Sequence, residues 1–327
     1  MTALLLKPIP IRIGFRKKSA AGGGGGSYTL YLDETLWFGG LSAWPGLTVQ
    51  STTQQFNGSD YTTASQTWTT KTSANTAKYL AGSCGSAGSG SGLGALFVTG
   101  STTYSPDTRS TDLQFYKNGT WTTKAAASVA IMLNQSAGTG EGSMLNMGGS
   151  SATSGYETRV DSYDYSGNTW TAQTALSQGR YYGGGGGSSY DAAIFMGGWG
   201  NSPVAAKNNV DSYDGSSWTN LSGLPTAISH NASGDGTPDT AINLAGYTGA
   251  GNVNLNSTFD GSSWTSQSAL PSGARTTCLC AGSQDNAIQA GGSGQVICQT
   301  WDLSSTTWTT QGNISVGVSG TGGGGNG

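Results

Sequence analysis

The sequence has 327 residues, of which 55 are Gly and only 9% are charged, against roughly 25% in an ordinary soluble domain. Glu occurs three times, so strong helix formers are scarce, whereas 10 Trp and 14 Tyr among 35% hydrophobic residues suffice for a core. This composition excludes a disordered chain and a mostly helical fold, and it favours an all-β protein.

The N-terminal segment 1–19 differs in charge from the rest of the chain. Its five basic residues precede the first acidic residue, Asp33, whereas the remaining chain has nine basic and seventeen acidic residues. We interpret 1–19 as an extended arm that docks on an acidic partner surface; a flexible solvated terminus and a nucleic-acid contact are the alternatives. The remaining chain is acidic and has no basic stripe, which argues against nucleic-acid binding. The docking residues are Lys7, Arg12, Arg16, Lys17 and Lys18.

The prolines of this arm and its alternating apolar residues predict an extended backbone. Pro8 and Pro10 favour an extended backbone. We expect no signal peptide, because the Lys-Pro pair at 7–8 breaks the short apolar run, and no membrane insertion, because no run of about 18 apolar residues exists. A strand that pairs with a neighbouring sheet edge would present the residues Ile9, Ile11, Ile13 and Phe15 on one side.

Two patterns then recur in a fixed order, and the first is a short apolar strand ending in Gly-Gly or a near match. We expect each doublet to supply the unusual backbone dihedrals of a tight exit from the strand. The copies are TLWFGG (35–40), ALFVTG (95–100), MLNMGG (144–149), AIFMGG (193–198), INLAGY (242–247) and AIQAGG (287–292).

The second pattern is an aromatic residue, a turn and a Trp, with Asp after the aromatic residue in most copies. We expect the ring to pack between repeats, the Asp to cap the turn, and Trp170, Trp218 and Trp264 to be largely buried. The first two copies have Asn57 and Lys117 instead of Asp, so their turns should be looser. The six Trp residues are Trp68, Trp121, Trp170, Trp218, Trp264 and Trp308, spaced 53, 49, 48, 46 and 44 residues apart.

A period near about 50 residues is typical of propeller blades. The order apolar–Gly-Gly, Tyr-Asp, Trp resembles the Kelch-repeat family and its galactose-oxidase-like relatives, over residues 20–313. WD-type repeats fit less well, since Trp301-Asp302 is the only Trp-Asp pair, and SYDGSSW (212–218) is one residue short of a sialidase Asp-box. The resemblance implies an all-β, six-bladed Kelch-like β-propeller whose blades are four-stranded meanders, preceded by the basic extension.

Gly-rich segments at 20–29 and 181–190 are expected to form strands next to the propeller axis, where missing side chains permit close backbone approach. The tail at 314–327 resembles a further segment of this kind. It therefore either closes the ring or projects into a partner.

A candidate ligand rim follows from the meander topology. Loops between second and third strands emerge on the same face as the connections between blades. Aromatic rings with a few polar groups suit a sugar or protein ligand, and ordinary local packing is the alternative. The second-to-third-strand loops carry Trp44, Tyr104, Tyr156, Trp199 and Tyr247, and the connections between blades carry Arg180, His230 and Arg275.

No catalytic constellation emerges from the sequence. We interpret the carboxylate pairs Asp161–Asp164 and Asp211–Asp214 as structural turn residues. His230 is the only His, which excludes a His-rich metal site and the copper site of galactose oxidase. We therefore expect no cofactor, metal or enzymatic activity. The four Cys residues lack a metal-ligand spacing and favour reduced thiols over a disulfide framework: Cys84, Cys278, Cys280 and Cys298.

Gly-rich Kelch-like chains are found among bacteriophage virion proteins. The resemblance implies a non-enzymatic tail, fibre or capsid-decorating protein, made in the host cytoplasm and displayed on the particle. Its partners would be other virion proteins, through the arm, and a host-surface glycan or protein. The rival interpretations are a Kelch-type sugar-processing enzyme and an intracellular protein–protein adaptor. An enzyme should have a polar axial pocket with Arg and Glu, whereas the inferred axial strands are mainly Gly, Ser and Ala.

Overall fold

The described part of the chain is built from β-strands and their connections, without a helix. In this computed structural model, the structure describes residues 35–42, 49–57, 67–86, 94–104, 106–138, 142–234, 238–314 and 318–319. The predicted arm, the Gly-rich segment 20–29, the tail beyond residue 319 and Trp44 lie outside these ranges. The expectation of an all-β fold is confirmed for the described residues.

Six four-stranded antiparallel sheets follow one another along the described chain, and we number them in chain order. The first sheet contains β29 (Val318–Ser319), β1 (Thr35–Ser42), β2 (Val49–Asn57) and β3 (Thr67–Lys71). The second sheet contains β4 (Gly82–Ser86), β5 (Gly94–Val98), β6 (Leu113–Lys117) and β7 (Thr120–Lys124). The third sheet contains β9 (Gln135–Gly138), β10 (Ser143–Met147), β12 (Val160–Asp164) and β13 (Thr169–Ala172).

The remaining three sheets have the same order of strands. The fourth sheet contains β15 (Gly184–Ser189), β16 (Ala192–Met196), β19 (Val210–Tyr213) and β20 (Trp218–Asn220). The fifth sheet contains β21 (Ala232–Gly234), β22 (Ile242–Tyr247), β23 (Asn252–Phe259) and β24 (Trp264–Ser266). The sixth sheet contains β25 (Leu279–Gly282), β26 (Asn286–Ala290), β27 (Cys298–Asp302) and β28 (Thr307–Gln311).

Two small sheets lie at the connections. One pairs β8 (Ile131–Met132) with β11 (Ser150–Ser151). The other pairs β17 (Trp199–Asn201) with β14 (Arg180–Tyr181) and β18 (Val204–Ala206).

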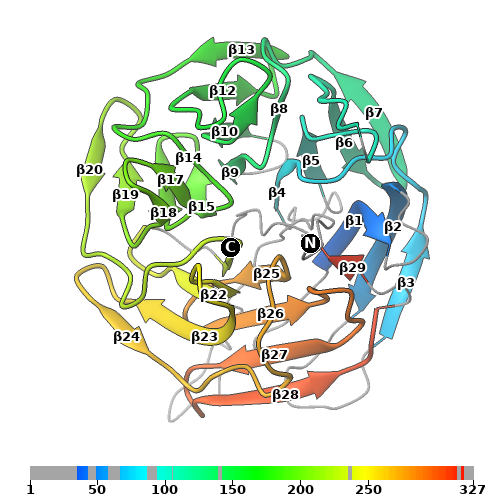
Figure 1. The fold of residues 1–327 in the computed structure, drawn as a ribbon. Coiled ribbons are helices and arrows are strands. Elements are labelled where there is room, and N and C mark those ends of the chain that lie inside the picture. Colours follow the sequence, from blue (N-terminus) through cyan, green and yellow to red (C-terminus); the bar gives the residue numbers. More distant parts are fainter. Residues whose placement is uncertain are drawn as a thin grey trace, which may run out of the picture.

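The six four-stranded sheets lie side by side around a common centre (Figure 1). In the second, third, fourth and sixth sheets the first strand along the chain is nearest the centre, as the labels β4, β9, β15 and β25 show. The outermost positions belong to β3, β7, β13, β20, β24 and β28. Consecutive first strands are neighbours: β4 lies beside β9, β9 beside β15, β15 beside β21, and β21 beside β25.

The second strand of five sheets is followed or ended by two residues with positive φ, at the predicted doublets. At Gly148-Gly149, Gly197-Gly198 and Gly291-Gly292 the first φ angle is 60°, 60° and 62°, and the second is 101°, 96° and 86°. The second and fifth sheets use Thr99-Gly100 and Ala245-Gly246, with φ of 54° at the Thr and 53° at the Ala. The predicted tight exit is confirmed in all five.

We expect Gly197→Ala to lower the free energy of unfolding by about 2–3 kcal/mol. The left-handed conformation disfavours a side chain, and a Cβ at this position would lie 2.6 Å from the carbonyl oxygen of Ile228. Ala245→Gly is the matched control, because Ala245 holds the same place in the fifth sheet, and it should change stability by less than about 1 kcal/mol. Urea unfolding measures both variants, and equal effects would contradict this account of the exit.

The innermost strands approach one another closely where they carry Gly. A Cβ on Gly184 would lie 2.6 Å from Ser233 Oγ on the neighbouring first strand, and a Cβ on Gly185 would lie 2.8 Å from the Cβ of Gln135. Any larger residue would separate the strands. The expectation for the Gly-rich segment 181–190 is confirmed.

In five of the six outer strands, the Trp residue links its sheet to the preceding one. Each indole N–H donates to a main-chain carbonyl that lies just after the preceding outer strand. The bonds join Trp121 to Thr72 (2.9 Å), Trp170 to Ala125 (2.8 Å), Trp218 to Thr174 (2.8 Å), Trp264 to Ser222 (2.9 Å) and Trp308 to Ser268 (3.0 Å).

The expectation that three of these Trp residues are largely buried is confirmed only in part. Trp121 is buried, but Trp170, Trp218 and Trp264 are only half-buried. Their strands β13, β20 and β24 lie at the periphery of the molecule (Figure 1). Trp68 and Trp308 are half-buried as well.

The Asp residues that follow the aromatic position cap the turns, as predicted. Asp214 Oδ1 accepts hydrogen bonds from the main-chain N–H groups of Ser216 (2.9 Å) and Ser217 (2.8 Å). Such bonds stabilise the ionised carboxylate, so the pKa of Asp214 lies well below its ordinary value and that of Asp260 is lowered to about 2. Asp164 and Asp302 cap their turns in the same way.

The turn after Lys117 departs from the prediction of a looser turn. Lys117 pairs with Thr120, which leaves a two-residue hairpin turn at Asn118 and Gly119. Both turn residues have positive φ, 49° and 81°. An Asn-Gly pair adopts this geometry readily, and it therefore replaces the Asp cap. The corresponding turn after Asn57 lies outside the described residues.

Residues 318–319 bring the end of the described chain back to its beginning. Ser319 pairs with Leu41 and Val318 pairs with Ser42, so β29 is a strand of the first sheet. On the outer side of this sheet, Trp68 lies at Cys298 of the sixth sheet. Burial raises the pKa of the Cys298 thiol, and a hydrogen bond with Trp68 opposes that rise. The first and sixth sheets are thus in contact.

Candidate functional site

The connections between sheets and the loops between second and third strands lie on one face, which we call the loop face. They pair with each other in antiparallel bridges, so the predicted common face is confirmed where these bridges occur. The pairs are Tyr79 with Ser101, Tyr181 with Trp199, and Ser229 with Tyr247.

A row of main-chain hydrogen bonds joins the starts of the innermost strands. Each participating residue lies two positions before its strand, and all have φ between 54° and 64°. The bonds run from Leu133 N to Leu80 O (2.7 Å), Tyr182 N to Leu133 O (3.2 Å), His230 N to Tyr182 O (2.7 Å) and Thr277 N to His230 O (2.9 Å). Sequence reasoning missed this row, because residues other than Gly carry no signal for a positive φ.

Four aromatic side chains, which we call the aromatic row, extend across the third, fourth and fifth sheets: Tyr156, Tyr181, Trp199 and Tyr247. The ring centroids of Tyr156 and Tyr181 are 5.2 Å apart, and those of Trp199 and Tyr247 are 6.1 Å apart. Tyr181 and Trp199 are partners across β14 and β17. All four residues are half-exposed. The sequence predicted three of them; Tyr181 was missed, although it is the first residue of the Gly-rich segment 181–190.

Tyr104, also predicted for the rim, packs locally instead. Its ring lies 6.2 Å from that of Tyr79, at the edge of a buried cluster that includes Leu133 and Tyr182. The Tyr79 hydroxyl donates to Asp107, and burial raises the pKa of both Tyr79 and Tyr182. Local packing, the alternative left open by the sequence, therefore accounts for Tyr104.

The two Arg residues predicted for the rim are not on the surface. Arg180 and Arg275 are each 1% exposed. Arg180 pairs with Asp211 and donates to the carbonyl of Gly197 (3.1 Å). Arg275 donates to the carbonyl of Gly291 (3.0 Å). The prediction was wrong for both, because each guanidinium turns inward and satisfies carbonyls of its own sheet.

The carboxylate pairs divide into two roles, which corrects a second expectation. Asp164 and Asp214 cap turns, as predicted. Asp161 and Asp211 are instead partners of Arg residues. Asp161 Oδ1 accepts from Arg159 Nη2 at 2.9 Å, and Asp211 accepts from buried Arg180.

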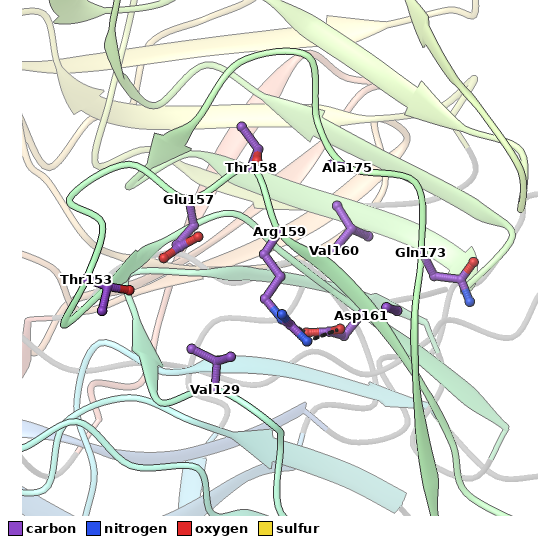
Figure 2. Close-up of a pocket in the computed structure, with 10 residues that line it drawn as sticks. Val129, Thr153, Glu157, Thr158, Arg159, Val160, Asp161, Gln173 and Ala175 are labelled. Atoms are coloured by element: carbon purple, nitrogen blue, oxygen red, sulfur yellow. Dashed lines mark hydrogen bonds and ion pairs between the residues drawn. The ribbon is translucent and has the colours of Figure 1, made fainter.

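The loop that carries Tyr156 also lines a pocket of about 350 Å³, within the roughly 300–1,000 Å³ of small-molecule sites. Arg159 and Asp161 form an ion pair on its wall (Figure 2). The Glu157 carboxylate makes no hydrogen bond or ion pair within the described part of the chain. Side chains around this space include Val129, Thr153, Glu157 and Arg159 (Figure 2). Sequence reasoning missed the pocket, because residues from three connections form it.

His230 lies on the loop face between two Tyr residues. Its ring stacks on Tyr182 at 3.6 Å and meets Tyr247 edge-on at 5.9 Å. Its Nδ1 lies 3.0 Å from Ser229 Oγ. Burial lowers the pKa of His230 to about 3, because the charged imidazolium would lose its hydration, so the ring is neutral near neutral pH.

We expect the free energy of unfolding to fall between about pH 6.5 and pH 5, by about 1 kcal/mol per pH unit. The unfolded chain binds a proton at His230 below about pH 6.5, whereas the folded chain does not, so acid favours unfolding. No other His occurs in the sequence. Urea unfolding across this range should show a flat profile for His230→Gln. Parallel profiles for the variant and the parent protein would contradict the assignment.

The remaining predicted site residues have simple outcomes. All four Cys residues are buried and free, so the expectation of reduced thiols is confirmed. Among the described residues, no group of three or more His, Cys, Asp and Glu side chains could hold a metal ion. The described part contains no helix long and apolar enough to cross a membrane. Trp44 and the five basic arm residues lie outside the described residues.

No family model matches the chain, and no curated protein matches its sequence. Function is therefore inferred from the repeat and the loop face.

Proposed function

We propose that the chain forms a closed, six-bladed β-propeller of the Kelch type. Five four-stranded meanders, and a further sheet that β29 completes, lie around a centre and support this arrangement. The Trp bonds between consecutive outer strands act as repeated links between blades. The observation that carries closure is the pairing of β29 with β1, since it joins both ends of the repeat array in one sheet.

Deletion of residues 318–327 tests this closure. Loss of β29 should lower the melting temperature by at least about 5 °C, because the first sheet loses a strand. Deletion of residues 320–327 keeps β29 and is the matched control. A crystal or cryo-electron microscopy structure of the full chain gives the number of blades directly. Five or seven blades, or an unchanged melting temperature without β29, would refute the proposal.

The biological role that fits best is a non-enzymatic structural component of a virion, in its tail, fibre or capsid decoration. A charge-poor, Gly-rich body and the Kelch-like pattern support this role. The half-exposed aromatic row supports a display function, because it offers ready contacts on one face. The innermost strands, built mainly from Gly, Ser and Ala, favour a closely packed axis over a catalytic one.

Mass spectrometry of purified virus particles tests this role. The protein should be present at a fixed copy number. Deletion of 1–19 should leave the melting temperature unchanged and abolish incorporation, since the basic arm is the proposed anchor to other virion proteins. A variant with the five basic residues of the arm changed to Gln is the matched control for charge. Incorporation of the truncated chain at full occupancy would refute the anchor.

A further inference from the structure

We propose that the loop face binds a neutral saccharide along the aromatic row and in the adjacent pocket. This inference rests on the display role proposed above. The row and the pocket share one loop, which contributes one ring to the row and part of the lining of the pocket. Tyr156 adds its ring to the row, and the next residue, Glu157, adds its carboxylate to the pocket. In this proposal, one ligand lies across this loop and contacts both.

The aromatic row offers the surface that the C–H face of a sugar ring requires. Trp199 is half-exposed, and its indole N–H makes no hydrogen bond within the described part of the chain. By contrast, outer-strand residues such as Trp218 use the same group to link sheets. Burial and the neighbouring Tyr156 raise the pKa of Tyr181 to about 12. Such rings combine stacking with polar contacts.

The pocket supplies acceptors and donors for sugar hydroxyl groups. The Glu157 carboxylate is free to accept, whereas the buried Asp161 carboxylate already accepts from Arg159 on both oxygens. Val129 adds an apolar wall. This mixture of a few polar groups with apolar contacts is typical of small-ligand sites.

The charges select a neutral saccharide over an anionic one. An acidic sugar would meet the unpaired Glu157 carboxylate in the pocket. The guanidinium of Arg159 is already shared between Asp161 (2.9 Å) and Ser128 Oγ (2.7 Å), and Arg180 is buried. No free cation of the pocket lining remains to balance a second negative charge. A neutral saccharide is not repelled by the Glu157 carboxylate, because its hydroxyl groups carry no charge.

A printed array of neutral, sialylated and sulfated oligosaccharides tests the proposal with the full chain. We expect neutral glycans to be retained, and the strongest neutral oligosaccharide is then titrated by calorimetry. Trp199→Ala should weaken its binding by about tenfold and Glu157→Gln by roughly fivefold. Tyr190→Ala is the matched control, because Tyr190 is 37% exposed at the turn between β15 and β16, at the opposite end of β16 from Trp199. It should bind like the parent.

Each other outcome overturns part or all of this assignment. Retention of acidic glycans alone refutes the neutral class, and a blank array refutes a saccharide; binding of a glycan-free cell-surface protein would then reassign the face to protein recognition. Equal affinity of parent, Trp199→Ala and Glu157→Gln refutes the location. Melting temperatures verify folding, with Tyr181→Ala as the substitute if Trp199→Ala does not fold. Particle incorporation of the same variants separates this failure from failure of the virion role.

Discussion

Replacing Arg180 with Ile is expected to lower the free energy of unfolding by about 3–5 kcal/mol. The guanidinium is 1% exposed and its partner Asp211 is also buried. Besides this pair, Arg180 donates to the carbonyls of Gly197 and Asn209, each at 3.1 Å, and stacks on the ring of Phe195 at 4.5 Å. The Ile variant leaves a buried carboxylate without its cation and the Gly197 carbonyl without its donor, whereas the Asn209 carbonyl still accepts from the N–H of Gly197. Urea unfolding measures the loss.

A second substitution should recover much of this loss. Ile228 of the fifth sheet corresponds to Arg180, because each residue lies at the same distance before the first strand of its sheet. Ser257 corresponds to Asp211, because each has the same place in the pairing of the second and third strands of its sheet. Arg180→Ile with Asp211→Ser therefore gives the fourth sheet the residues of the fifth, and it should unfold within about 2 kcal/mol of the parent. A double variant no more stable than Arg180→Ile alone would contradict the ion-pair explanation.

Arg159→Ile provides the control for a less buried pair. The Arg159 side chain is 33% exposed, so water can hydrate Asp161 once the guanidinium is removed. We expect a loss of about 1 kcal/mol. An effect as large as that of Arg180→Ile would show that burial does not set the difference.

The repeat pattern predicted the elements whose positions depend on local chemistry. Gly doublets marked the exits of second strands because only a residue without a side chain enters positive φ freely. Asp marked the turns because its carboxylate bonds main-chain N–H groups two and three residues ahead, as at Asp214. The prediction of a looser turn after Lys117 was wrong, because Asn118 and Gly119 form a tight turn through their positive φ angles and need no Asp cap. The Asn-Gly pair therefore decides the turn in spite of the missing Asp.

The direction of long side chains could not be predicted in this way. Arg180 and Arg275 follow the outer strands in connections, where a charged residue is usually exposed, yet both are buried. Lys78 occupies the equivalent position in the second sheet and is also buried, donating to the carbonyl of Asp112 at 2.8 Å. Main-chain carbonyls at the exits of the second strands accept hydrogen bonds from these cations. Such acceptors exist only in the folded sheet, so composition and spacing do not indicate them.

The aromatic row shows the same limit. The rim prediction found Tyr156, Trp199 and Tyr247 because they follow the second strands. It did not find Tyr181, whose place in the row comes from pairing with Trp199 across β14 and β17. It also missed Glu157, since a free carboxylate in a pocket is defined by neighbours distant in sequence. Topology places loops on a face, whereas tertiary contacts decide which of their side chains stay available.

Trp218→Ala should lower the free energy of unfolding by about 3 kcal/mol, the lower end of the range for large aromatic residues, because the ring is half-buried. The ring packs 4.9 Å from that of Tyr213 and against a core cluster that includes Leu145 of the third sheet and Phe195 of the fourth. Its N–H bond to the carbonyl of Thr174 joins the same two sheets. Removing the side chain therefore weakens packing within the fourth sheet and its link to the third.

Trp218→Phe separates these two contributions. Phe retains most of the ring contact with Tyr213 but cannot donate to Thr174, so the loss should be about 1 kcal/mol. The same pair of changes at Trp264, which donates to Ser222 at 2.9 Å, should give similar values, because the link repeats from sheet to sheet. Urea unfolding of the four variants measures both terms. A loss below about 1 kcal/mol for Trp218→Ala would mean that the outer strands contribute little to holding neighbouring sheets together. A Phe variant as unstable as the Ala variant would instead place the stabilisation in the hydrogen bond rather than in the ring.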